Sequence, residues 1–107
     1  MRWVRCFWDE EAVSFYFELD TDGYVIRQVE CREPGGEAVA AASLTEWQEA
    51  QNGNRWGEYE SVYGLTAESP ISEWEGHDPQ WLSVDEFESV WSTARQELQD
   101  RHRHPPS

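Results

Sequence analysis

Apolar and polar side chains alternate at every position of the stretch "VSFYFELD", residues 13–20. The apolar set is Val13, Phe15, Phe17 and Leu19. Because successive side chains of a β-strand point to opposite faces of its sheet, this period of two predicts a strand with one buried face. Such a strand needs neighbours to pair with and a layer to cover its apolar face, so this stretch constrains the fold most.

The stretch "ELDTDGYVIRQVE", residues 18–30, joins this strand to a second one predicted over residues 24–32. Asp20 and Asp22 stand beside Gly23, which is compatible with a cation-binding loop or with a tight turn. A calcium loop spreads its oxygen ligands over about twelve residues and has Gly at the sixth position. Gly23 is only the fourth residue counted from Asp20, whereas Thr21-Asp22-Gly23 fits a three-residue hairpin loop closed by a left-handed Gly. We therefore expect a turn and no metal site.

Two pairing registers are open to this hairpin. The three-residue loop pairs Leu19 with Val25 and places Arg27 opposite Phe17 on the apolar face. A two-residue turn instead pairs Arg27 with Glu18, but it sets polar residues opposite the phenylalanines. We favour the first register for its apolar contacts. Arg27 then either extends past the edge of the sheet or meets a buried acid.

The other expected elements are strands followed by helices. Further strands are predicted over residues 2–8 and 37–43, with a short one at 59–66. Short helices are predicted at 43–53 and 69–76. A longer helix, 83–100, begins with a Ser83–Glu86 capping box and carries an apolar stripe. That stripe is Val84, Phe87, Trp91, Ala94 and Leu98.

This order of elements predicts an α+β fold. We expect an antiparallel sheet of four or five strands, packed on one face by the C-terminal helix and one or two short helices. The chain has 107 residues, enough for one domain with a core of its own. We assign residues 1–100 to that domain and residues 101–107 to a disordered C-terminal tail.

The net charge is -14, from 22 acidic and 8 basic residues, and every basic residue is Arg. A surface this acidic repels nucleic-acid phosphates and anionic lipid headgroups, so neither nucleic acid nor membrane is an expected partner. A basic protein is the expected partner, because long-range attraction raises its association rate. The charge can also serve solubility alone. The first residues contain no apolar run typical of a signal peptide, so we expect a cytoplasmic protein.

The sequence contains no motif that predicts a reaction. It has neither a phosphate-binding glycine loop nor a nucleophile elbow, and the spacing of Cys6 and Cys31 matches no zinc site. His102 and His104 alternate in the tail, where a metal would find no fixed geometry. We therefore expect no cofactor, no metal and no catalytic residues.

Two hypotheses for function remain. In the first, the chain is a binding protein that inhibits a basic partner, in the manner of an immunity protein or antitoxin. Acidic and aromatic residues in two loops are its candidate contacts: Asp20, Asp22, Trp56, Glu58, Tyr59 and Glu60. In the alternative, the chain is a small-molecule binder or an enzyme with a pocket between sheet and helix. Arg27 would be the anion clamp of that pocket and tryptophans would form its walls.

Two segments resemble an uncharacterised family of small acidic bacterial proteins. Residues 18–30 resemble its Glu-Leu-Asp, acidic turn and Val-Arg-Lys-Val-Glu segment. Residues 78–91, "DPQWLSVDEFESVW", resemble its C-terminal segment, in which Asp-Pro and an aromatic residue lead into Ser-x-Glu-Glu-Phe-Glu-x-Val-Trp. The resemblance covers about a quarter of the chain. It departs at Gly23, where charged residues are common, and in the longer middle at 44–60.

The positions that match the first segment are Glu18, Leu19, Asp20, Asp22, Arg27, Val29 and Glu30. Those that match the second are Asp78, Pro79, Trp81, Ser83, Glu86, Phe87, Glu88, Val90 and Trp91. Members of that family sometimes lie beside genes for secreted toxins, so the resemblance implies an immunity function, with a toxin as the basic partner. The family has no established catalytic residues, and none are carried over.

Overall fold

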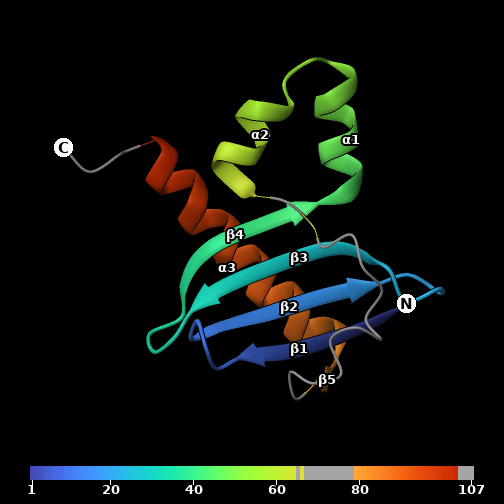
Figure 1. Ribbon diagram of the computed structural model, residues 1–107, viewed down its shortest axis with the longest axis vertical. Helices are drawn as coiled ribbons and strands as arrows, with labels where there is room; N and C mark the ends of the chain where they lie inside the picture. The colour runs from blue at the N-terminus through green and yellow to red at the C-terminus, as the bar shows by residue number, and fades with distance from the viewer. Residues whose placement is uncertain (65, 67–78, 104–107) are drawn as a thin grey trace.

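Five strands form one antiparallel sheet in the computed structural model, in the order β4-β3-β2-β1-β5 (Figure 1). The structure describes residues 1–64, 66 and 79–103. The strands are β1 (Arg2–Trp8), β2 (Val13–Leu19), β3 (Val25–Arg32), β4 (Glu37–Ser43) and β5 (Gln80–Leu82). The first four lie where the sequence predicted strands. The fifth is a three-residue strand that extends the sheet beyond β1.

Three helices accompany the sheet: α1 (Leu44–Asn52), α2 (Trp56–Tyr63) and α3 (Val84–Arg103). In Figure 1, α3 runs behind the sheet, and α1 and α2 form a helical hairpin that stands beyond β4. The predicted α+β arrangement is therefore confirmed. α3 continues to Arg103, past the end expected at residue 100.

The pairing of β2 with β3 follows the register that sequence reasoning rejected. Leu19 pairs with Val25 as expected, but a bulge follows, and Glu18 then pairs with Arg27. Phe17 faces Gln28, and the next phenylalanine faces Glu30. The favoured register is therefore wrong beyond the first pair. The bulge puts Arg27 on the face of the sheet that α3 covers, beside an acid instead of a phenylalanine.

The loop between β2 and β3 is a turn held by its own aspartate. The Asp20 carboxylate accepts hydrogen bonds from the backbone N–H groups of Asp22 (2.9 Å) and Tyr24 (3.0 Å). Gly23 has a φ of 87°, a conformation that costs Gly nothing. These bonds close the turn, as do the backbone bonds that Asp20 makes with Gly23 and Tyr24, so the predicted turn is confirmed.

The middle of the chain is helical where a strand was predicted. Residues 59–63 belong to α2, so the short strand at 59–66 is wrong. The helix predicted at 43–53 is present as α1. The Ser43 hydroxyl accepts its capping bond from the Glu46 N–H, and Gly53 ends it. The helix expected at 69–76 lies outside the described residues.

Each face of the sheet carries its own apolar cluster. One cluster consists of Val4, Cys6, Phe15, Phe17, Leu19 and Val25. The other joins the sheet to α3 and consists of Val29, Cys31, Ala38, Ala41, Ala94 and Leu98. Apolar side chains are therefore buried on both faces of the central strands, and few positions of β2 and β3 are exposed.

The α3 helix begins with the predicted capping box. The Ser83 N–H donates to the Glu86 carboxylate (3.0 Å), and the Ser83 hydroxyl accepts from the Glu86 N–H (3.1 Å).

Candidate functional site

Arg27 lies in an ionic cluster between the sheet and α3. Its guanidinium makes two parallel hydrogen bonds to the Glu18 carboxylate (2.7 and 2.8 Å) and further bonds to Glu88 on α3. Trp3 donates its indole N–H to the same Glu18 carboxylate (2.8 Å). The guanidinium also lies about 5 Å from the ring centres of Phe87 and Trp91. The cluster therefore ties β1, β2 and β3 to the N-terminal half of α3.

The charges in this cluster stabilise one another. Hydrogen bonds from Arg27 are the main reason that the pKa of Glu18 lies below its ordinary value, while burial opposes them. Hydrogen bonds to Glu18 raise the pKa of Arg27. The side chain of Arg27 is only 20% exposed, and its four hydrogen bonds leave it little capacity for a further anion. This arrangement disfavours Arg27 as the clamp of a ligand pocket.

A second arginine, Arg95 on α3, fastens the helical hairpin. It donates to the backbone carbonyl of Ala41 on β4 (2.8 Å), to the carboxylate of Glu46 on α1, and to the Tyr59 hydroxyl on α2 (3.0 Å). Its guanidinium lies 3.9 Å from the ring centre of Tyr63 and 4.3 Å from that of Trp91. Three helices and one strand thus converge on a single side chain.

Tyr59 is part of the same cluster. Its hydroxyl accepts a bond from the Ser43 N–H (2.8 Å) and donates one to Glu46 (2.8 Å). Burial, together with the neighbouring Glu46, raises the pKa of Tyr59 to about 12, although Ser43 and Arg95 oppose this. The phenol therefore stays protonated at neutral pH and serves as a fixed donor and acceptor.

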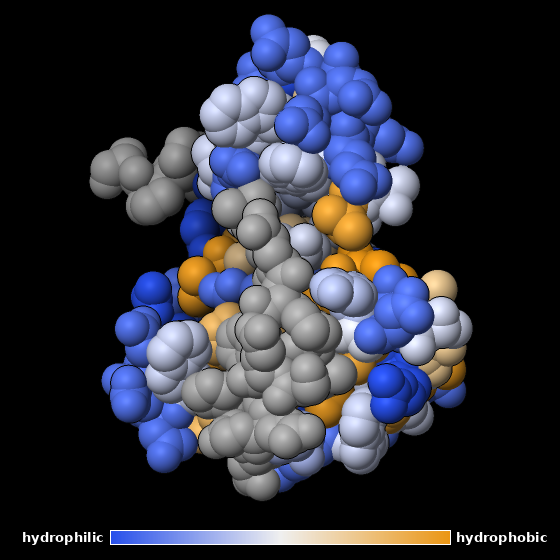
Figure 2. Space-filling view, turned by 45° about the vertical axis from the view of Figure 1, so that its right-hand side comes forward, coloured by the Kyte–Doolittle hydropathy of each residue, from blue (hydrophilic) through white to orange (hydrophobic). Residues whose placement is uncertain are grey.

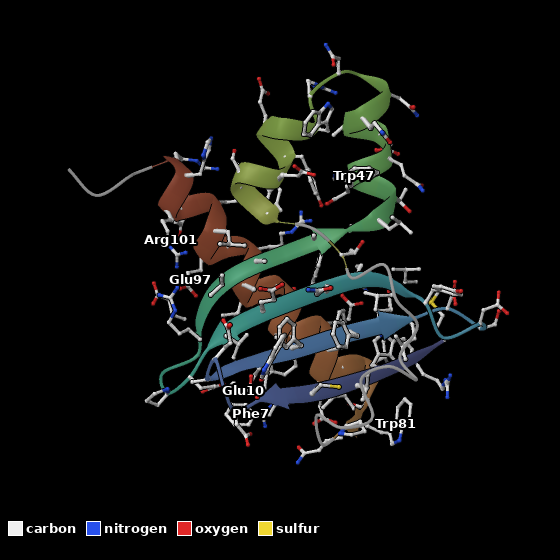
Figure 3. The ribbon with its side chains drawn as sticks, in the orientation of Figure 1. Phe7, Glu10, Trp47, Trp81, Glu97 and Arg101 are labelled. Atoms are coloured by element: carbon white, nitrogen blue, oxygen red, sulfur yellow. The ribbon has the colours of Figure 1, made fainter. Side chains whose placement is uncertain are left out.

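Side chains of α3 also bond the backbone of β4, an edge strand of the sheet (Figure 3). Glu97 accepts from the Ala38 N–H (3.2 Å), and Arg101 donates to the Ala38 carbonyl (2.9 Å). With Arg95 on the Ala41 carbonyl, these contacts occupy backbone groups that could otherwise pair with another strand. The β4 edge is therefore protected by α3.

Four of the predicted contact residues lie on one helix, α2. Trp56 is 48% exposed, and Glu58 is also exposed. Tyr59 and Glu60 are half-buried and make internal bonds, Glu60 as acceptor from the indole N–H of Trp47 (3.0 Å; Figure 3). Only Trp56 and Glu58 of these four are thus available to a partner without rearrangement.

The other two predicted contacts, Asp20 and Asp22, lie in the turn between β2 and β3. That turn is at the opposite end of β3 from the β3–β4 loop, and Figure 1 shows it apart from α2. The Asp22 side chain is exposed, whereas the Asp20 carboxylate holds the turn. The structure therefore does not bring the six predicted residues into one patch.

A groove of about 910 Å³ opens between the helical hairpin and the C-terminal half of α3. The hairpin side carries Glu46, Glu49, Ala50, Arg55, Glu58, Tyr59, Ser61, Val62 and Tyr63. The α3 side carries Arg95, Gln99, His102 and Arg103. Sequence reasoning missed this groove, because its walls come from segments some forty residues apart and no local pattern links them.

No family model, curated protein or solved structure matches the chain. Within the described residues, no helix is both long and apolar enough to cross a membrane. Among those same residues, no group of three or more His, Cys, Asp or Glu side chains is placed to hold a metal ion.

Proposed function

We propose that this protein is a non-catalytic binding protein that inhibits a basic protein partner, in the manner of an immunity protein or antitoxin. The observation that carries the proposal is that the Trp56 ring and the Glu58 carboxylate are both exposed on α2, in a helical hairpin that projects from the sheet. Figure 2 shows that this hairpin forms a lobe with a largely hydrophilic surface.

An exposed tryptophan is a common energetic anchor in protein interfaces, because burying its large ring gains free energy with few rotatable bonds to fix. Acidic neighbours around such an anchor attract a basic surface and raise the association rate. Glu49 on α1 and Glu58 on α2 are both exposed and form no ion pair within the described residues. They add exposed negative charge to the hairpin that carries Trp56.

The hairpin that carries Trp56 is already held in place. Glu46 on α1 and Tyr59 on α2 both bond Arg95, and Trp47 on α1 bonds Glu60 on α2. A fixed hairpin loses little conformational entropy when it binds, which favours tight association. Tyr59 and Glu60 therefore support the proposed surface from inside, and Asp22 would be a separate contact on a large partner.

The test is an affinity capture from a lysate of the organism that encodes the chain, at low and high salt. The wild type is compared with Trp56→Ala, with Glu58→Gln, and with the control Asp85→Asn. Asp85 is an exposed acid on α3, so the control changes the net charge as Glu58→Gln does. We expect one basic protein that the wild type and the control retain at low salt, and that both lose at high salt.

Trp56→Ala should lose this protein at either salt concentration, and Glu58→Gln should retain less of it. Retention that is independent of salt contradicts the electrostatic mechanism. Equal retention by Trp56→Ala and the wild type contradicts the placement of the interface on α2. The alternative function, a pocket between sheet and helix with Arg27 as its clamp, is disfavoured because Glu18 and Glu88 already bind Arg27.

A further inference from the structure

The groove between the helical hairpin and α3 is lined by two arginines that form no ion pair within the described residues. Among the described residues, Arg5, Arg27, Arg32, Arg95 and Arg101 form ion pairs with glutamates. Arg2 instead lies over the ring of Trp81. Arg55 and Arg103 remain without an ion pair in that part of the chain, and both line the groove, next to His102.

This concentration matters because of the charge of the whole chain. The chain carries 22 acidic and 8 basic residues, so most of its surface repels anions. A small anion can settle only where the acids nearby do not outweigh the cations. In the groove, Arg95 and Glu46 bond each other, and Arg55 and Arg103 balance Glu49 and Glu58, next to the His102 imidazole.

A small cation has no comparable reason to choose the groove. Exposed carboxylates such as Asp9, Glu10 and Asp85 lie elsewhere on the molecule and would attract it equally. The positive side chains of the groove thus distinguish this site for anions and not for cations.

The other residues of the groove offer apolar surface to an organic ligand. Ala50 and Val62 lie among the charged residues, and the Tyr59 and Tyr63 rings pack together with their centres 5.1 Å apart. A volume of about 910 Å³ is within the range of sites that hold small molecules. Tyrosine rings and small aliphatic side chains of this kind give an organic ligand apolar contact area.

We propose that the groove between α1, α2 and α3 binds a small organic anion with an aromatic body, whose charged group is held by Arg103, Arg55 and His102. Trp56, the anchor of the proposed docking surface, does not line the groove, although Glu49 and Glu58 contribute to both sites. It also differs from the pocket at Arg27, because it lies between helices and uses different arginines.

The test is a titration of the full chain with phenyl phosphate, followed through its backbone amide resonances by NMR. Inorganic phosphate and benzylamine serve as comparison probes. Arg103→Gln and Arg55→Gln remove the proposed contacts, and Arg32→Gln is the control. Arg32 is 64% exposed, pairs with Glu37 where β3 turns into β4, and does not line the groove, so the control removes the same charge elsewhere.

We expect phenyl phosphate to shift resonances of residues 49–63 and 95–103 in a saturable way. Each groove variant should weaken this binding about tenfold, because each loses a charge-assisted hydrogen bond, whereas Arg32→Gln should bind as the wild type does. Inorganic phosphate should bind more weakly, since it lacks the ring.

Three results would overturn the proposal: no saturable shifts in these residues, equal binding by Arg103→Gln and the wild type, or tighter binding of benzylamine than of phenyl phosphate. None of them bears on the docking surface, because the capture experiment depends on Trp56. Unchanged amide spectra of the groove variants without ligand establish that those variants are folded.

Discussion

Arg27 and Glu18 form an ion pair between β3 and β2, and Arg27 also bonds Glu88 on α3. The Glu18 side chain is 9% exposed, so removal of its partner leaves a buried carboxylate without its main donor. We expect Arg27→Ala to lower the free energy of unfolding by about 3–5 kcal/mol, the usual cost of breaking a buried pair. Arg32→Ala, which removes an exposed pair, should cost about 1 kcal/mol or less.

Urea unfolding at neutral pH, followed by tryptophan fluorescence, measures both values. If the two variants lose similar stability, Arg27 is not the central contact of this cluster. Glu88→Gln provides an intermediate case, because Glu88 is 45% exposed and Arg27 keeps Glu18 as a partner. Its cost should lie between the other two.

Glu18 and Glu30 should respond to pH with opposite signs. Hydrogen bonds from Arg27 lower the pKa of Glu18, whereas burial raises the pKa of Glu30 despite its bond from Gln28. A lowered carboxyl pKa contributes stability above the pKa of the unfolded chain, and this contribution is lost as the pH falls through the folded value. A raised carboxyl pKa costs stability at neutral pH, and acidification relieves that cost.

We therefore expect Glu18→Gln to be less stable than the wild type at pH 7, with a difference that shrinks below the ordinary glutamate pKa of 4.5. Glu30→Gln should match or exceed wild-type stability at pH 7 and lose that advantage on acidification. Both variants change the net charge equally, so each controls for the other. Urea midpoints across this pH range decide the signs, and parallel curves for the two variants contradict the assignment.

At the scale of the elements, Tyr59 connects the helical hairpin to the sheet. Its hydroxyl bonds the Ser43 N–H, Glu46 and Arg95. Tyr59→Phe removes the side-chain acceptor of the Ser43 N–H and one bond each from Glu46 and Arg95, at a cost of about 1–3 kcal/mol. We expect faster amide hydrogen exchange throughout residues 44–63, with little change in β2.

Tyr63→Phe is the matched control for this prediction, because the Tyr63 hydroxyl accepts one bond of 3.3 Å, from Gln99. Exchange in that variant should resemble the wild type. If Tyr59→Phe accelerates exchange equally in β2 and β3, the hairpin does not open as a separate unit.

Local patterns in the sequence predicted β1 to β4, α1 and α3, from their apolar residues, turn signals or capping boxes. They did not predict β5, which has three residues. The β2–β3 register could not be predicted in this way. Sequence reasoning weighed apolar contacts on a single face, but both faces are packed here, and a bulge reconciles the Leu19–Val25 pair with the Glu18–Arg27 pair. The ionic pair depends on α3, far away in the sequence.

The α2 helix escaped prediction for a similar reason. Its sequence contains Gly57 and strand-favouring residues such as Tyr59 and Val62. Packing of its tyrosines on Arg95, which lies over thirty residues later, stabilises the helix against these local preferences. The exposed Trp56 was predicted as a contact from its type and setting. The arginines of the groove were not, because their convergence is a property of the tertiary fold.

At the scale of the whole molecule, arginines connect the layers, while the excess of acids remains at the surface. Arg27 joins the sheet to the first half of α3, and Arg95 joins the second half to the hairpin. Trp91 contacts both guanidiniums. These two guanidiniums pair with glutamates inside the molecule, so they do little to neutralise the acids on its surface. With a net charge of -14, the exposed acids repel one another, and this repulsion opposes folding.

Added salt should therefore stabilise the protein at neutral pH. Raising NaCl from about 0.15 M to 1 M shortens the screening length from about 8 Å to 3 Å, which weakens repulsion between exposed acids more than the buried pairs. We expect a higher thermal midpoint of unfolding in 1 M NaCl at pH 7.

The same comparison near the isoelectric point of about 4.3 provides the control. Net repulsion is absent there, and salt weakens only the remaining ion pairs, so the midpoint should stay constant or fall. An equal rise at both pH values contradicts the electrostatic explanation, because it identifies a salt effect on hydration. A rise confined to pH 7 means that the acidic surface costs stability, so the requirements of the fold do not account for that surface.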